Sequence, residues 1–134
     1  GTSKTFRYHF TKLAEKLSDV APGGLVLEVG SNDGTLLEAL TTHGMRAIGV
    51  EPSQQLAEIS KEKCEAVYTN FLDKELSDFL IKEYGDFDFV VGNNVFAHID
   101  DLVGAFRIAQ TFGIENIVDF FGETSNCIFN LTSQ

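Results

Sequence analysis

The sequence predicts an α/β fold, a Rossmann-like and mostly parallel sheet of about five strands with helices on both faces. Apolar runs of strand length alternate with stretches that carry apolar residues at helical spacing. Strand–helix–strand units of this kind make right-handed crossovers, which place successive strands parallel in one sheet. We therefore expect one domain over residues 1–134, with its ligand at the carboxyl ends of the strands.

Each element follows from a local pattern. Apolar residues at helical spacing over 6–17 predict a helix within an N-terminal segment, 1–22, and the apolar run 25–29, stopped by Gly30, predicts a buried strand. Pro52 is expected to begin a helix that runs to residue 63, whose charged end looks like a solvated face. The other predictions are helices over 35–42, 74–83 and 99–112 and strands over 46–50, 66–69, 87–91 and 116–121. The βα core then spans 25–121, and 122–134 form a tail with room for one short element.

Composition excludes several classes of function. The formal net charge of −10 gives a surface that repels phosphate backbones, so no nucleic-acid partner is expected. No apolar run approaches the roughly 20 residues that span a bilayer, so we expect no membrane segment and a cytoplasmic location. Cys64 and Cys127 are too few and too far apart for a metal knuckle or a disulfide framework, so no metal site is predicted.

A glycine-containing turn follows the first predicted strand. Gly30 and Gly34 allow close approach of the backbone, and the next helix would begin there with free amides, so a ligand is expected at this turn. Glu51 ends the second predicted strand, 23 residues after Glu28. Dinucleotide-binding folds place an acid at a separation of about 20 residues, where its carboxylate accepts from both ribose hydroxyls. The alternative is an acid that only favours a helix N-terminus.

Glu28 helps to distinguish between two kinds of candidate cofactor, a dinucleotide and a cationic molecule. An acid at the end of the first strand would repel the pyrophosphate of a dinucleotide, and the turn does not match the Gly-x-Gly-x-x-Gly cradle that such phosphates need. A cationic ligand suits this position better. S-adenosylmethionine carries a sulfonium and an amino group and has no phosphates, so it is the predicted cofactor, with NAD as the alternative.

Three segments carry a further signal: residues 26–37 (Val-Leu-Glu-Val-Gly-Ser-Asn-Asp-Gly-Thr-Leu-Leu), 49–53 (Gly-Val-Glu-Pro-Ser) and 92–99 (Gly-Asn-Asn-Val-Phe-Ala-His-Ile). Together they resemble the sugar C-methyltransferases, which are class I S-adenosylmethionine-dependent enzymes. The resemblance implies methylation of a carbon beside the keto group of a small acceptor, a nucleotide-linked deoxysugar.

The resemblance also implies roles for particular residues. His98 would face the sugar as the catalytic residue, since imidazole can exchange a proton near neutral pH. A half-buried packing or capping role for His98 is the alternative. The implied cofactor-binding residues are Glu28, Gly30, Ser31, Asn32 and Gly34 at the first turn, Glu51 and Pro52 at the second, Asn70 and Phe71 beside the adenine, and Asn93 and Asn94 near the methyl donor.

The sequence departs from the family's pattern at both ends. No cysteine-rich zinc module precedes the domain, the segment 111–121 lacks the usual proline-glycine turn, and no long C-terminal half follows. We therefore expect the cofactor-binding part alone, truncated relative to the seven-stranded class I fold. An open sheet edge would remain at its C-terminal end, which a homodimer could cover. The alternative functions are a non-catalytic domain that binds the cofactor or dimerises, and an NAD-dependent reductase or epimerase.

Overall fold

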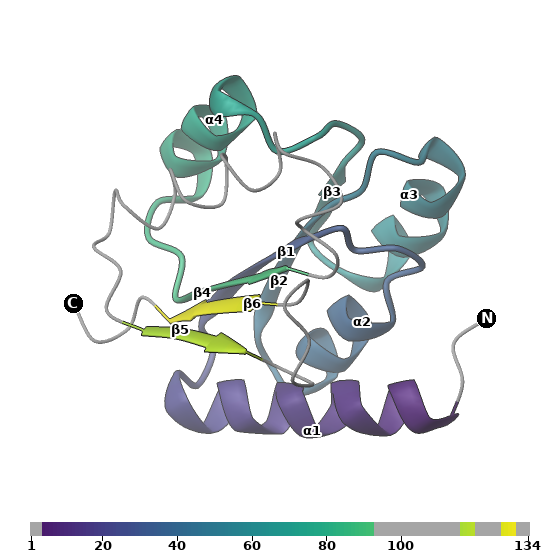
Figure 1. Ribbon diagram of the computed structural model, residues 1–134, viewed down its shortest axis with the longest axis vertical. Coiled ribbons are helices and arrows are strands. Elements are labelled where there is room, and N and C mark those ends of the chain that lie inside the picture. The colour runs from purple at the N-terminus through teal and green to yellow at the C-terminus, as the bar shows by residue number, and fades with distance from the viewer. Residues whose placement is uncertain (1–3, 93–115, 120–126, 131–134) are drawn as a thin grey trace.

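The computed structural model describes residues 4–92, 116–119 and 127–130, which form one six-stranded sheet with helices on both sides (Figure 1). The strand order across the sheet is β3-β2-β1-β4-β6-β5. Within these residues no helix is long and apolar enough to cross a membrane. In chain order the elements are α1 (Lys4–Val20), β1 (Leu25–Val29), α2 (Thr35–Thr42), β2 (Arg46–Val50), α3 (Gln54–Ser60), the 3-10 helix η1 (Lys61–Lys63), β3 (Ala66–Tyr68), α4 (Lys74–Tyr84), β4 (Phe89–Gly92), β5 (Asn116–Asp119) and β6 (Cys127–Asn130).

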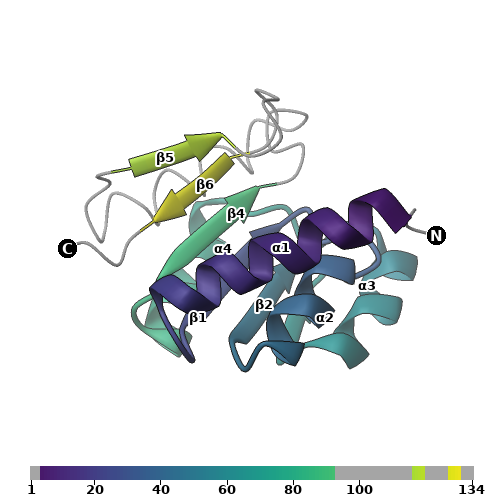
Figure 2. The same cartoon turned by 90° about the horizontal axis from the view of Figure 1, so that it is seen from below.

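Strands β3, β2, β1 and β4 run parallel and confirm the predicted Rossmann-like fold. Every residue of β1 is buried, as expected of a central strand covered on both faces. Leu25, Leu27 and Val29 pack toward α4, while Val26 packs toward α1 and α2 on the other face. Figures 1 and 2 show α4 on the side of the sheet opposite to α1. Glu28 alternates onto the face of α1 and α2, beside Gly49 of β2.

Several element boundaries differ from the predicted ones: the helix expected to run to residue 63 ends at Ser60 and is followed by η1, and β3 ends earlier than predicted. Two differences at element starts have a clear cause. Helix α3 begins at Gln54 rather than at Pro52, because Ser53 is its N-cap and accepts a hydrogen bond from Leu56 N–H at 3.3 Å. Strand β4 begins at Phe89 rather than at residue 87. Asp88 is engaged instead with the start of β1: its Oδ2 accepts from Leu25 N–H at 2.8 Å and its own N–H donates to the Leu25 carbonyl at 2.8 Å.

The C-terminal end of the sheet has one strand more than predicted. Strand β5 forms within the predicted range, but β6, from the segment expected to be a tail, lies antiparallel between β4 and β5. Among the described residues the sheet therefore has six strands, of which β6 alone runs against the others, and β5 is the outermost strand on this side. The homodimer through this edge stays a prediction, and the predicted helix over 99–112 lies outside the described residues.

The Asp88 contact predicts a measurable loss of stability. Asp88→Ala removes a charged acceptor from a backbone N–H and should lower the free energy of unfolding by about 1.5–3 kcal/mol. Asp86→Ala, at an exposed position in the same loop, is the matched control and should change it by less than about 0.5 kcal/mol. Urea unfolding followed by circular dichroism measures both. Equal values for the two variants would show that Asp88 does not anchor β1.

Candidate functional site

The turn between β1 and α2 has an unusual backbone. Gly30, Asn32 and Gly34 all have positive φ, at 77°, 56° and 85°. Glycine adopts this region freely, and asparagine tolerates it better than most other residues. The turn is closed by Gly34 N–H, which donates to the Ser31 carbonyl at 3.0 Å. Within the sequence Gly-Ser-Asn-Asp-Gly, the first, third and fifth residues are therefore suited to the positive φ values of this turn.

Neighbouring backbone segments approach this turn closely. A Cβ built on Gly34 would lie 2.7 Å from Cβ of Ser60, at the end of α3. A Cβ on Gly49 would lie 2.9 Å from Oγ of Ser31 and 2.8 Å from Cδ1 of Leu37. Glycine at these two positions thus lets α3 and β2 pack directly against the turn.

The backbone amides of the turn are engaged within the protein. Gly30 and Ser31 N–H both donate to the Val50 carbonyl, at 2.8 and 3.1 Å. Thr35 N–H donates to Asp33 Oδ1 at 3.1 Å. The expectation that the start of α2 offers free amides to a ligand is therefore wrong for Gly34 and Thr35. The turn therefore presents side chains and hydrogen-bond acceptors to a ligand, rather than these amides.

Glu51 joins the turn to the segment after β2. Its side chain is 8% exposed; Oε1 accepts from Asn32 N–H at 2.8 Å and Oε2 accepts from Ser53 N–H at 2.9 Å. A carboxylate has about four acceptor sites, so two remain after these bonds. The carboxyl ends of β1 and β2 are thus tied together by the acid that the spacing predicted as a ribose ligand. No feature of the sequence indicated that Glu51 would also link these two segments.

Glu28 lies deeper, under the turn and on the face of α1 and α2. It is 1% exposed and pairs in register with Gly49 on one side and Val91 on the other. Burial raises the pKa of the Cys64 thiol to about 11, and the Glu28 carboxylate adds to this shift. Glu28 is thus buried near the carboxyl end of β1, and its role toward a cationic ligand stays a prediction.

Of the two predicted residues after β3, Asn70 lines a surface hollow. Asp73, the N-cap of α4, and Leu76 and Phe79 within that helix border it too. Phe71 is 40% exposed and is not among the residues that line the hollow. Pro52 is half-buried beside Glu51. Asn93, Asn94 and His98 lie outside the described residues.

Two further side chains were not predicted at the site. Lys63, expected on a solvated helix face, donates from Nζ to the Asp33 carbonyl at 2.9 Å. Asp33 Oδ1 also accepts from the Thr35 hydroxyl at 2.7 Å. The Asp33–Thr35 contact is local in the sequence, but Lys63 is 30 positions from Asp33, so no spacing rule in the sequence would have found the lysine.

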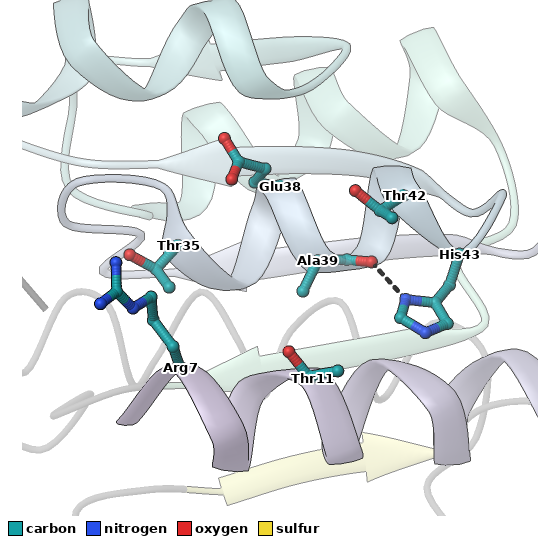
Figure 3. Close-up of a pocket in the computed structure, with 7 residues that line it drawn as sticks. All are labelled: Arg7, Thr11, Thr35, Glu38, Ala39, Thr42 and His43. Atoms are coloured by element: carbon teal, nitrogen blue, oxygen red, sulfur yellow. Dashed lines mark hydrogen bonds between the residues drawn. The ribbon is translucent and has the colours of Figure 1, made fainter. Parts of the chain in front are cut away.

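A separate hollow lies between α1 and α2 (Figure 3). His43, at the end of α2, bonds through Nδ1 to the Ala39 carbonyl at 2.8 Å. His43 is the C-cap residue of α2, and this contact ties its ring to the last turn of the helix. Within the described ranges, no group of three acidic, histidine or cysteine side chains could hold a metal ion. The residues around this hollow are Arg7, Thr11, Thr35, Glu38, Ala39, Thr42 and His43.

Comparisons with known proteins point to one family. A family model described as a methyltransferase domain matches residues 5–113. Over 97 residues the chain is 30% identical to the C-methyltransferase NovU of Streptomyces niveus, an alignment that covers 70% of this chain and 23% of that protein. The chain thus spans about a quarter of the length of this curated relative.

Solved structures share the fold. An O-methyltransferase from Bacillus cereus, in complex with SAH, superposes with a TM-score of 0.52 at 16% identity and covers 96% of this chain and 81% of its own. The sugar N-methyltransferase KedS8 from Streptoalloteichus sp. gives a TM-score of 0.53 at 23% identity, over 76% of this chain and 42% of its own. At these identities the likeness concerns the fold alone.

The close approach at Gly34 can be separated from its backbone conformation. Gly34→Ala places a Cβ against Ser60 at a positive φ, whereas Gly44→Ala has a similar φ of 80° and nothing within 4 Å. We expect Gly44→Ala to lose about 1–2 kcal/mol of stability and Gly34→Ala about 1–3 kcal/mol more, because Ser60 must shift. Urea unfolding of both variants checks this. If both lost the same amount, the packing of α3 on the turn would not depend on Gly34.

Proposed function

Since the chain belongs to the methyltransferase domain family, we propose that it is the cofactor-binding part of an S-adenosylmethionine-dependent methyltransferase. The observation that carries this proposal is the buried carboxylate of Glu51 at the end of β2, tied to the glycine turn at the end of β1. The carboxyl ends of neighbouring parallel strands are where ligands bind in open α/β sheets.

Glu51 suits the ribose of the cofactor. Its carboxylate is held by Asn32 and Ser53 N–H, so its remaining acceptor sites are fixed in direction. Two ribose hydroxyls are donors that match such sites with charge-assisted hydrogen bonds. Phe71 and Asn70, after the neighbouring strand β3, are proposed beside the adenine, where an exposed ring can contact the base.

The turn favours the amino-acid part of S-adenosylmethionine over a pyrophosphate. Phosphate binding at such turns uses backbone N–H groups, but Gly30 and Ser31 donate theirs to Val50. Two carboxylates, Glu28 and Glu51, add negative charge where phosphates would lie. A cationic sulfonium and amino group are favoured by the same charges. The NAD-dependent alternative is accordingly disfavoured.

The residues present fit this cofactor. Among the described side chains, Ser31 Oγ is buried without a hydrogen-bond partner, which is costly unless a ligand or water supplies one. Together with Gly30, Asn32 and Gly34 it would hold the methionine part, with Pro52 beside the ribose and Asn93 and Asn94 near the sulfonium. When bound, the cofactor supplies an electrophilic methyl group.

A small-molecule acceptor completes the proposal. The likeness to a C-methyltransferase supports methylation of carbon, and the resemblance of residues 92–99 to the sugar C-methyltransferases supports a nucleotide-linked keto-deoxysugar as the acceptor. Carbon methylation requires a proton to leave the acceptor carbon. His98, which follows β4 in the sequence, is proposed to take that proton, since imidazole titrates near neutral pH.

Substitution of Glu51 tests the ribose assignment. Glu51→Ala should lower affinity for S-adenosylhomocysteine by about 2–4 kcal/mol in calorimetric titration, because two charge-assisted hydrogen bonds are lost. Glu65→Ala is the matched control: Glu65 also makes two hydrogen bonds, to Arg46, but at the opposite end of β2. Its affinity should equal that of the wild type. If Glu51→Ala bound S-adenosylhomocysteine as tightly as the wild type, Glu51 would not be the ribose ligand.

Substitution of His98 tests the catalytic proposal. His98→Ala should bind S-adenosylhomocysteine as the wild type does and lose at least about 100-fold in methyl transfer to a keto-deoxysugar nucleotide. His43→Ala, at the end of α2, should retain transfer. If the wild-type chain binds the cofactor without transferring a methyl group, the non-catalytic alternative holds for this chain. If His98→Ala fails to fold, a structural role for His98 replaces the catalytic one.

A further inference from the structure

Lys63 lies at the end of η1, yet its side chain reaches the glycine turn. Its Nζ donates to the Asp33 carbonyl at 2.9 Å, thirty positions earlier in the chain. Its Cδ would lie 3.1 Å from a Cβ on Gly34. The aliphatic part of the lysine thus packs over Gly34 while its ammonium binds the residue just before it.

The backbone of Lys63 is also held by α2. The Thr41 hydroxyl, in the last turn of the helix, lies 3.0 Å from the Lys63 carbonyl and 2.9 Å from the Leu37 carbonyl and shares its one hydrogen between them. Lys63 therefore contacts the last turn of α2 through its carbonyl and, through its ammonium, the residue before the N-cap Gly34. Neighbouring Lys61 differs, because it pairs with Glu58 on the exposed surface of α3.

The Asp33 carbonyl belongs to the part of the turn with the most unusual backbone conformation. Asp33 lies between Asn32, whose N–H is held by Glu51, and Gly34, the N-cap of α2, and both neighbours have positive φ. A charge-assisted hydrogen bond from Lys63 to this carbonyl fixes the orientation of the peptide that lies between two residues with positive φ. A turn already ordered before binding loses less entropy when a ligand arrives.

We propose that Lys63 is a positioning residue for the cofactor. Its ammonium holds the Asp33 carbonyl and so keeps the glycine turn in the shape that receives the amino-acid part of the cofactor. This inference rests on the proposed function, because it takes the methionine part to lie at this turn. It assigns to η1 a role in binding although Lys63 need not touch the ligand.

The test compares variants and two ligands by calorimetric titration. Lys63→Met keeps the aliphatic packing and removes the charge; we expect it to bind S-adenosylhomocysteine about tenfold more weakly, with a melting temperature within about 2 °C of the wild type. Its affinity for 5′-methylthioadenosine, which lacks the amino-acid part, should be unchanged. Lys63→Arg should recover most of the affinity for S-adenosylhomocysteine, and Lys61→Met should match the wild type.

The outcomes separate this inference from the proposed function. Wild-type affinity of Lys63→Met for S-adenosylhomocysteine overturns the inference and leaves the proposed function standing. Equal weakening toward both ligands, with a lower melting temperature, also overturns it, since Lys63 would then act only on stability. If the wild-type chain itself binds neither ligand, the proposed function fails and the inference with it.

Discussion

The carboxylate of Glu51 is the contact on which the ligand edge of the sheet depends. Its two oxygens join the glycine turn after β1 to the segment that begins α3, through Asn32 and Ser53 N–H. A carboxylate that is 8% exposed would be costly without such donors, and two backbone amides supply them. The same group that organises two turns thereby keeps acceptor sites in a fixed direction for a ligand.

Around this contact the backbone segments pack unusually close. Gly34 allows α3 to approach closely, and Gly49 leaves room for the Ser31 side chain. A Cβ at either position would collide with these neighbours. Several amides of the turn form hydrogen bonds inside the protein, and the Ser31 hydroxyl is buried without a hydrogen-bond partner among the described residues. The proposed cofactor site therefore relies on carboxylates and on this hydroxyl, which is consistent with a cationic, phosphate-free ligand.

The sequence predicted the elements whose signals are local. The apolar runs of β1 and β2 and the glycines around α2 gave their bounds correctly, because burial and turn conformation act over a few residues. Strand β6 was not predicted, since its pairing with β4 joins distant segments. The contacts of Glu51 with Asn32 and of Lys63 with Asp33 were missed for the same reason. Spacing could identify Glu51 as a candidate ligand but could not show what holds it.

The most direct test of this account is a ¹⁵N–¹H NMR titration of the chain with S-adenosylhomocysteine, with NADH added to a second sample. Binding at the Glu51-linked turns predicts that the amide signals of Gly30, Asn32 and Ser53 shift at micromolar ligand, while NADH leaves them in place. A folded chain whose turn amides do not respond to S-adenosylhomocysteine, or respond equally to NADH, would contradict the assignment of this edge as an S-adenosylmethionine site.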